Sequence, residues 1–145
     1  MAQILSYAYY KNFLEFYKLR VRDVLSEIDI YIKSYEDEMD ISQVAFYLGI
    51  SESEVCDIML YEKMHHIDVT NFLKIMEMGS SYICRLYKKE KECGSPYIYT
   101  IEQIAYIYEL EIDLVEKACE RLGISEIKSN LLAAIFSEIS GHGAI

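Results

Sequence analysis

The sequence contains few of the residues that interrupt helices. Its 145 residues include one proline, six glycines and no tryptophan. Proline and glycine end helices or permit unusual backbone angles, so their scarcity favours long helical segments. No long segment alternates apolar and polar residues in the way that half-buried strands do. We therefore expect an all-α fold, with a small β-ribbon near residues 97–99 as the one exception.

The sequence also lacks a cysteine or histidine pattern that would bind metal. Its four cysteines are widely spaced, with no Cys-x-x-Cys pair and no histidine at ligand spacing. This spacing indicates neither a zinc site nor a disulfide framework, so we expect free thiols and a reducing cytoplasm. The first residues lack the basic region of a signal peptide, and no apolar run approaches the roughly 20 residues of a membrane span. We expect no metal, no cofactor and no membrane contact.

Catalytic motifs are likewise missing. There is no glycine-rich phosphate loop and no Gly-x-Ser-x-Gly sequence. His65 and His66 are adjacent, so on a helix their imidazoles point in different directions, and no cysteine lies nearby. Glu62 and Asp68 lie three residues on either side, which is the spacing of ordinary surface ion pairs. We expect a protein that is not an enzyme.

What the sequence does contain is an apolar pattern that recurs three times, at residues 44–50, 72–76 and 104–108. Each occurrence predicts two short helices joined by a tight turn, in units at about 40–62, 68–92 and 100–123. Possible capping boxes open three of the helices: Asp40 with Gln43, Ser51 with Glu54, and Thr100 with Gln103. The period also fits a helical-hairpin array, but the spacing between units differs and no repeat signature recurs.

The first unit places Ala45 on the inner helix face, Gly49 in the turn, and Val55 and Ile58 beyond it. It resembles the helix-turn-helix superfamily of DNA-binding domains, and the resemblance covers residues 41–60 well, 69–91 loosely and 101–121 moderately. The middle unit departs from the pattern at Leu73 and Glu77, and Glu109 replaces the turn glycine in the third unit. The resemblance implies that the start and outer face of a second helix contact DNA.

These outward positions differ in charge between the units. In the third unit four of the six are acidic, and in the first unit Glu52 and Asp57 lie in a segment that is acidic throughout, so we expect no DNA contact in either. In the middle unit the outward positions are Gly79, Ser80, Ser81, Cys84, Arg85 and Lys88, and Lys89 and Lys91 continue the helix. Hydroxyls and backbone N–H groups at a helix start can bind phosphate, and arginine can recognise guanine. The predicted reading helix is therefore residues 80–91, and the predicted DNA-binding residues are Ser80, Ser81, Arg85, Lys88, Lys89 and Lys91.

Charge is distributed unevenly along the chain. The net charge of −10 divides into +3 for residues 1–22, −10 for 23–62, +2 for 63–99 and −5 for 100–145. A phosphate backbone interacts with the local face presented to it, so an acidic protein can still bind DNA through one basic patch.

The two ends of the chain predict further helices. Residues 3–36 contain no glycine or proline and have apolar residues at steps of three and four. One helix of that length would extend for about 50 Å. It must therefore bend, break near residues 18–20, or pair with a second helix in a homodimer. The alternative is that this segment forms two consecutive core helices. We expect an N-terminal segment at 1–36, a helical domain at 37–145, and a final helix at about 125–140 capped by Ser125.

Two hypotheses about function follow. The first is a dimeric transcriptional regulator that binds double-stranded DNA through residues 80–91. The second is a non-catalytic interaction module on a helix-turn-helix scaffold, whose acidic faces hold a basic protein as an anti-regulator or a mimic of DNA charge would.

Overall fold

The computed structural model describes residues 9–140 and is mostly helical, which confirms the all-α class. The chain forms two compact units, one made of residues 22–88 and the other of residues up to 21 together with residues from 89 onward. These boundaries differ from the division at residue 36 that the sequence suggested. Among the described residues, no helix is both long and apolar enough to cross a membrane.

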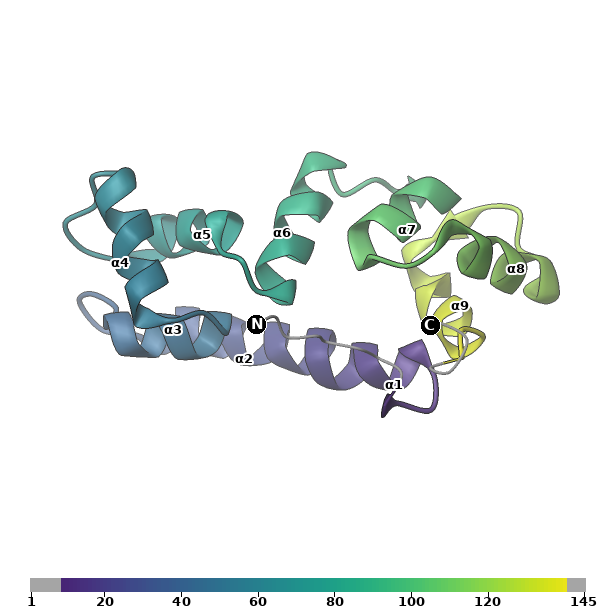
Figure 1. Ribbon diagram of the computed structural model, residues 1–145, viewed down its shortest axis with the longest axis horizontal. Coiled ribbons are helices and arrows are strands. Elements are labelled where there is room, and N and C mark those ends of the chain that lie inside the picture. The colour runs from purple at the N-terminus through teal and green to yellow at the C-terminus, as the bar shows by residue number, and fades with distance from the viewer. Residues whose placement is uncertain (1–8, 141–145) are drawn as a thin grey trace. The chain divides into compact units, whose positions relative to one another are not determined.

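The unit formed by residues 22–88 is entirely helical in its regular structure (Figure 1). It contains α2 (Asp23–Ser34), α3 (Ile41–Leu48), α4 (Glu52–Tyr61), α5 (Val69–Met78) and the first part of α6 (Tyr82–Glu92). Its core consists of apolar side chains with no exposed surface, among them Val44, Leu48, Val55, Phe72 and Ile75. The apolar spacing in the sequence therefore marks the buried faces of α3, α4 and α5.

The α3–α4 pair has the tight turn that the sequence predicts. Gly49 adopts the left-handed conformation (φ 69°), and the backbone N–H of Ile50 donates to the carbonyl of Ala45 at 3.1 Å. This conformation favours glycine because it has no Cβ. The predicted capping box at the start of α3 is only half formed: Asp40 accepts from the N–H of Gln43, whereas the Gln43 side chain accepts from the Tyr31 hydroxyl at 3.3 Å.

The pair α7 (Ile101–Tyr108) and α8 (Ile112–Leu122) repeats this turn 60 residues later. Glu109 takes the left-handed conformation (φ 58°), and the N–H of Leu110 donates to the carbonyl of Ala105 at 2.9 Å. At the start of α7, Thr100 and Gln103 form the complete capping box. Residues 60 positions apart in α3–α4 and α7–α8 are therefore structurally equivalent.

The middle pair, α5 and α6, has a different turn. Gly79 follows α5 with an extended conformation (φ −70°, ψ 163°), so no left-handed residue connects the two helices. The two departures noted in the sequence, at Leu73 and Glu77, thus coincide with a real difference in geometry. The looser resemblance of this unit follows from that difference.

The N-terminal helix begins later than the sequence suggested. Asn12 caps it by accepting from the N–H of Glu15, and α1 covers Phe13–Tyr17. Residues 9–12 are not α-helical, so the prediction of a helix from residue 3 is wrong there; residues 3–8 lie outside the described part. At Lys18–Arg22 the backbone forms a π-helical segment before α2. The backbone therefore stays helical at the position where a break was one of the expectations, and a wider π-helical turn is found there instead of a break.

The C-terminal region also differs from its prediction. Strands β1 (Ile98–Tyr99) and β2 (Ile127–Lys128) form an antiparallel ribbon in which Tyr99 lies opposite Ile127. The ribbon near residues 97–99 is confirmed, whereas the single helix at 125–140 is wrong. A 3-10 helix (Ser129–Leu131) and the short α9 (Leu132–Ser137) follow β2 instead.

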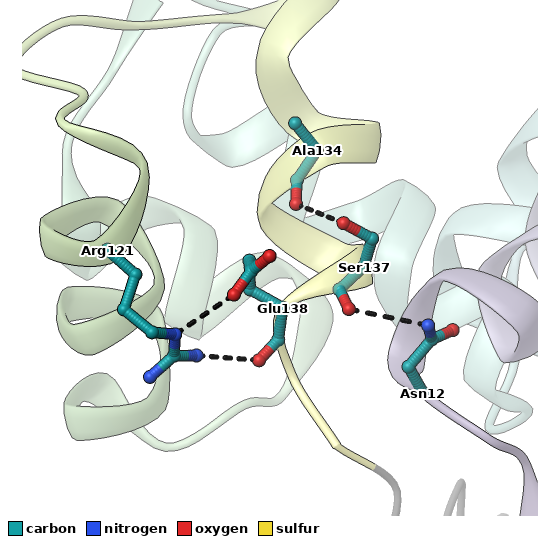
Figure 2. A network of polar contacts seen from close by, with 5 residues as sticks. All are labelled: Asn12, Arg121, Ala134, Ser137 and Glu138. Atoms are coloured by element: carbon teal, nitrogen blue, oxygen red, sulfur yellow. Dashed lines mark hydrogen bonds and ion pairs between the residues drawn. The ribbon is translucent and has the colours of Figure 1, made fainter.

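A polar network holds the end of α9 in place (Figure 2). The guanidinium of Arg121, on α8, donates to the Glu138 carboxylate at 3.0 Å and to its carbonyl at 2.7 Å. The Asn12 side chain donates to the carbonyl of Ser137 at 3.3 Å, and the Ser137 hydroxyl donates to the carbonyl of Ala134 at 2.6 Å. These contacts satisfy carbonyls that the end of a helix leaves without partners.

Candidate functional site

The start of α6 is the predicted phosphate-binding position, and a carboxylate of the protein itself occupies it. The backbone N–H of Ser80 donates to Glu54 at 2.7 Å, and the Ser80 hydroxyl donates to the other carboxylate oxygen at 2.8 Å. The Ser81 hydroxyl donates to the carbonyl of Leu48 at 2.6 Å and accepts from the N–H of Cys84 at 3.3 Å. The groups expected to bind phosphate are therefore engaged within the unit.

The arginine of the predicted site folds back along its own helix. Nη1 of Arg85 donates to the carbonyl of Ser80 at 2.6 Å, and its guanidinium lies over the Tyr82 ring, 5.8 Å from the ring centroid. Both contacts are made within two turns of chain. This position holds the planar fork of the guanidinium beside the start of α6, where a guanine contact would require it to extend away from the helix.

The lysines of the predicted site do not all face solvent in the same way. Lys88 and Lys91 are exposed, whereas the Lys89 ammonium forms an ion pair with Glu109 at 2.8 Å and lies 5.0 Å from the Tyr106 ring centroid. Lys89 and Lys91 also belong to a different compact unit from Ser80, Ser81, Arg85 and Lys88. The structure brings Ser80, Ser81 and Arg85 together at the start of α6, and engages each of them there.

Cys84 is not an outward residue, which corrects the face predicted for α6. Its side chain is fully buried. Burial raises the pKa of its thiol to about 11. The reason is the α5–α6 turn: a Cβ built on Gly79 would lie 2.6 Å from Cys84 Sγ, so the two residues are in close approach. The register carried over from the first unit correctly places Ile83 and Leu86 on the buried face, and it is wrong at Cys84, where the different turn brings the side chain inward as well.

We predict that native Cys84 resists thiol reagents while Cys56, which is exposed, reacts readily. At pH 8 a thiol of pKa about 11 is ionised in only about one molecule in a thousand, and burial blocks access as well. Alkylation by iodoacetamide, followed by mass spectrometry of the peptides, measures both rates in one sample. We expect Cys84 to react at least about 100-fold more slowly than Cys56. Similar native rates would contradict the inward position of Cys84, and equal rates in urea are the control.

The role of Glu54 differs from the one that its sequence position predicts. The capping-box spacing of Ser51 and Glu54 predicts that the Glu54 side chain returns to the N-cap of its own helix. Ser51 does accept from the N–H of Glu54 at 3.0 Å, but the Glu54 carboxylate accepts from Ser80 in the turn between α5 and α6. The partner lies 26 residues away, and no local sequence signal indicates it.

Replacing Glu54 with alanine should destabilise the unit by about 1–2 kcal/mol, since two hydrogen bonds from Ser80 to a charged group are lost. Glu52→Ala is the matched control: it removes an acid from the same helix turn, but one that accepts a single bond from the Ser42 hydroxyl at 3.0 Å. We expect a loss of at most about 0.5 kcal/mol for the control. Urea unfolding of the whole chain, followed by circular dichroism, measures both. Equal losses would show that Glu54 acts only through the dipole of α4.

The outer face of α4 is the second candidate surface. Its exposed residues form two adjacent rows four residues apart, one with Glu52, Cys56 and Leu60 and the other with Ser53, Asp57 and Tyr61. Leu60 is 80% exposed and Tyr61 is 75% exposed. Large apolar side chains that are exposed together, with polar residues around them, are typical of a protein contact surface.

Among residues 9–140, no group of three or more histidine, cysteine, aspartate or glutamate side chains could hold a metal ion. His65 and His66 are both exposed, and Nε2 of His66 lies 3.8 Å from a carboxylate oxygen of Asp68.

The chain matches no protein-family model, no curated protein and no solved structure. Its function must therefore be inferred from its own residues.

Proposed function

We propose that this chain is a non-catalytic, acidic protein-interaction module built on a helix-turn-helix scaffold, and that it holds a basic partner protein. The observation that carries the proposal is the Glu54 carboxylate on Ser80. A phosphate would have to displace this negatively charged group to reach the start of α6. The electrostatic attraction that makes a helix start a phosphate site is already satisfied there.

The charge of the unit that contains α4 supports the same proposal. Residues 22–88 include 6 basic and 13 acidic residues, a net charge of −7. Residues 34–73 include nine acidic residues and a single lysine, Lys63. At about 0.1 M salt, charges interact over about 10 Å. A surface of this composition repels a phosphate backbone and attracts lysine and arginine side chains.

DNA binding by residues 80–91 is the competing proposal, and the exposure of Lys88 favours it. A cation at this position of a helix in a major groove would contact phosphate. Affinity from so few available cations would be low and would fall steeply with salt.

Fluorescence anisotropy of the whole chain with three labelled probes tests the proposal. The probes are a random-sequence DNA duplex, an amphipathic peptide of about 18 residues made of leucine and lysine, and its counterpart made of leucine and glutamate. In about 50 mM salt we expect the lysine peptide to bind at least tenfold more tightly than either of the others.

Two results would overturn it. If the lysine peptide binds no better than the glutamate peptide, the acidic surface does not select basic partners. If the duplex binds best, and the double substitution Arg85→Glu with Lys88→Glu abolishes that binding without changing the thermal melt, the DNA-binding proposal replaces this one.

A further inference from the structure

We propose that the outer face of α4 is the docking surface for a basic amphipathic segment of the partner protein, with Leu60 and Tyr61 as its apolar anchors. This inference rests on the proposed function and assigns the surface and the chemistry of the ligand. The anchors would pack against apolar side chains of the segment, while Asp57 and Glu52 would pair with its lysines and arginines.

The α7–α8 pair provides an internal comparison for this face. Residues 60 positions apart are equivalent, and the exposed and buried positions of α4 and α8 follow the same order. At the places of Cys56, Asp57, Leu60 and Tyr61, α8 has four charged residues, all exposed: Glu116, Lys117, Glu120 and Arg121. The scaffold therefore accommodates charged residues at these positions and does not require apolar ones. The apolar side chains of α4 need another explanation, which a binding partner provides.

The apolar area continues toward α3. Phe46 is 77% exposed and lies one helical turn after Ser42, on the same side of α3. The Ser42 hydroxyl donates to Glu52, in the first turn of α4, at 3.0 Å. This bond places the exposed side of α3 beside the start of the α4 face. The surface therefore extends from Phe46 across Glu52 and Cys56 to Leu60 and Tyr61.

The charges on this surface select the occupant. Asp57 and Glu62 form no ion pair among the described residues, and Lys63 is the one lysine or arginine in residues 34–73. A second copy of this chain, docked through the same face by twofold symmetry, would place the acids of the two copies opposite one another. A basic segment would place lysine or arginine there instead, and so we assign the surface to a basic partner.

The test uses the leucine–lysine peptide and a variant that places the α8 residues on α4, Leu60→Glu with Tyr61→Arg. This double substitution keeps the net charge, and the scaffold already folds with the same residues in α8. We expect it to weaken peptide binding at least tenfold. The matched control, Ile112→Glu with Tyr97→Arg, also removes two exposed apolar residues and keeps the net charge, but in the other unit. We expect it to change binding by less than twofold.

A second pair of variants tests the charge. Asp57→Lys should weaken peptide binding at least threefold, whereas Asp113→Lys, an exposed acid in the first turn of α8, should have no such effect. If the wild type binds the peptide but the α4 variants behave as their controls do, the surface assignment is wrong and the proposed function stands. If the wild type does not bind the peptide, the proposed function itself fails. If the wild type sediments as a dimer that Leu60→Glu with Tyr61→Arg dissociates, the face is a self-interface and the inference is overturned.

Discussion

Replacing Phe136 with alanine should destabilise the unit that contains α9 by about 3–5 kcal/mol. Phe136 has no exposed surface, and its ring lies 4.8 Å from that of Phe13, 4.9 Å from Tyr108 and 5.0 Å from Tyr17, between ring centroids. Alanine would leave a cavity among three aromatic rings, two from α1 and one from α7, and it would remove the edge-to-face contacts with Phe13 and Tyr108. Urea unfolding followed by circular dichroism measures the loss.

Hydrogen exchange of the same variant identifies which unit is affected. We expect faster exchange of backbone amides in α1, α7, α8 and α9, because all of them belong to the unit that contains Phe136. Phe136→Leu is the conservative control, and it should cost less because leucine fills more of the cavity. A loss below about 1 kcal/mol for alanine would mean that the aromatic cluster is not the core of this unit.

The two helix pairs with a left-handed turn were predictable because their signals are local. The Ala45 and Gly49 positions, and the Thr100 and Gln103 cap, lie within a few residues of the contacts that they make. Glu109 was less expected, since a residue with a Cβ is disfavoured at positive φ. Its neighbours compensate, because Ile104 and Ala105 are buried like their counterparts Val44 and Ala45, and Leu110 is buried as well. Apolar periodicity thus located the turn without the glycine.

The C-terminal segment was not predictable in the same way. Ile127, Leu131 and Ile135 have helical spacing, and Ser125 can cap a helix, so local rules favoured a helix at 125–140. The backbone at Ile127 instead pairs with Tyr99, 28 residues earlier in the chain. Strand pairing depends on a distant partner, and one sequence gives no sign of which partner is present. The later apolar residues then form the short helix α9.

The candidate site shows the same limit. Arg85 and Ser80 were placed correctly at the start of α6, but what they contact depends on Glu54, Leu48 and the shape of the α5–α6 turn. A helix-turn-helix pattern records how two helices cross, because crossing needs small and apolar residues at set positions. Whether the exposed side of such a pair contacts DNA or protein depends on its surface residues. The way in which the two helices pack does not determine which residues these are.

Replacing Gly79 with alanine should destabilise the unit of residues 22–88 by about 2–3 kcal/mol, through overpacking. The added Cβ would lie 2.6 Å from Cys84 Sγ, so one of the two atoms must move, and 3.2 Å from Cys84 Cβ, which is a tight contact. The backbone conformation of Gly79 is not left-handed, so an alanine there is strained by contact and not by its φ angle. Urea unfolding of the variant and the wild type measures the difference.

The second substitution Cys84→Ala separates this explanation from a general intolerance of the turn. It removes the sulfur that the new Cβ would strike, while alone it should cost about 1 kcal/mol for the small cavity that it leaves. If contact with the sulfur is the cause, the double variant should be more stable than the sum of the two single losses predicts. If the losses of unfolding free energy in the two single variants add up to the loss in the double variant, the destabilisation by Gly79→Ala arises in the backbone of the turn. In that case the close approach of Gly79 and Cys84 would not be the reason that Cys84 is buried in α6, whereas the equivalent residues Cys56 and Glu116 are exposed.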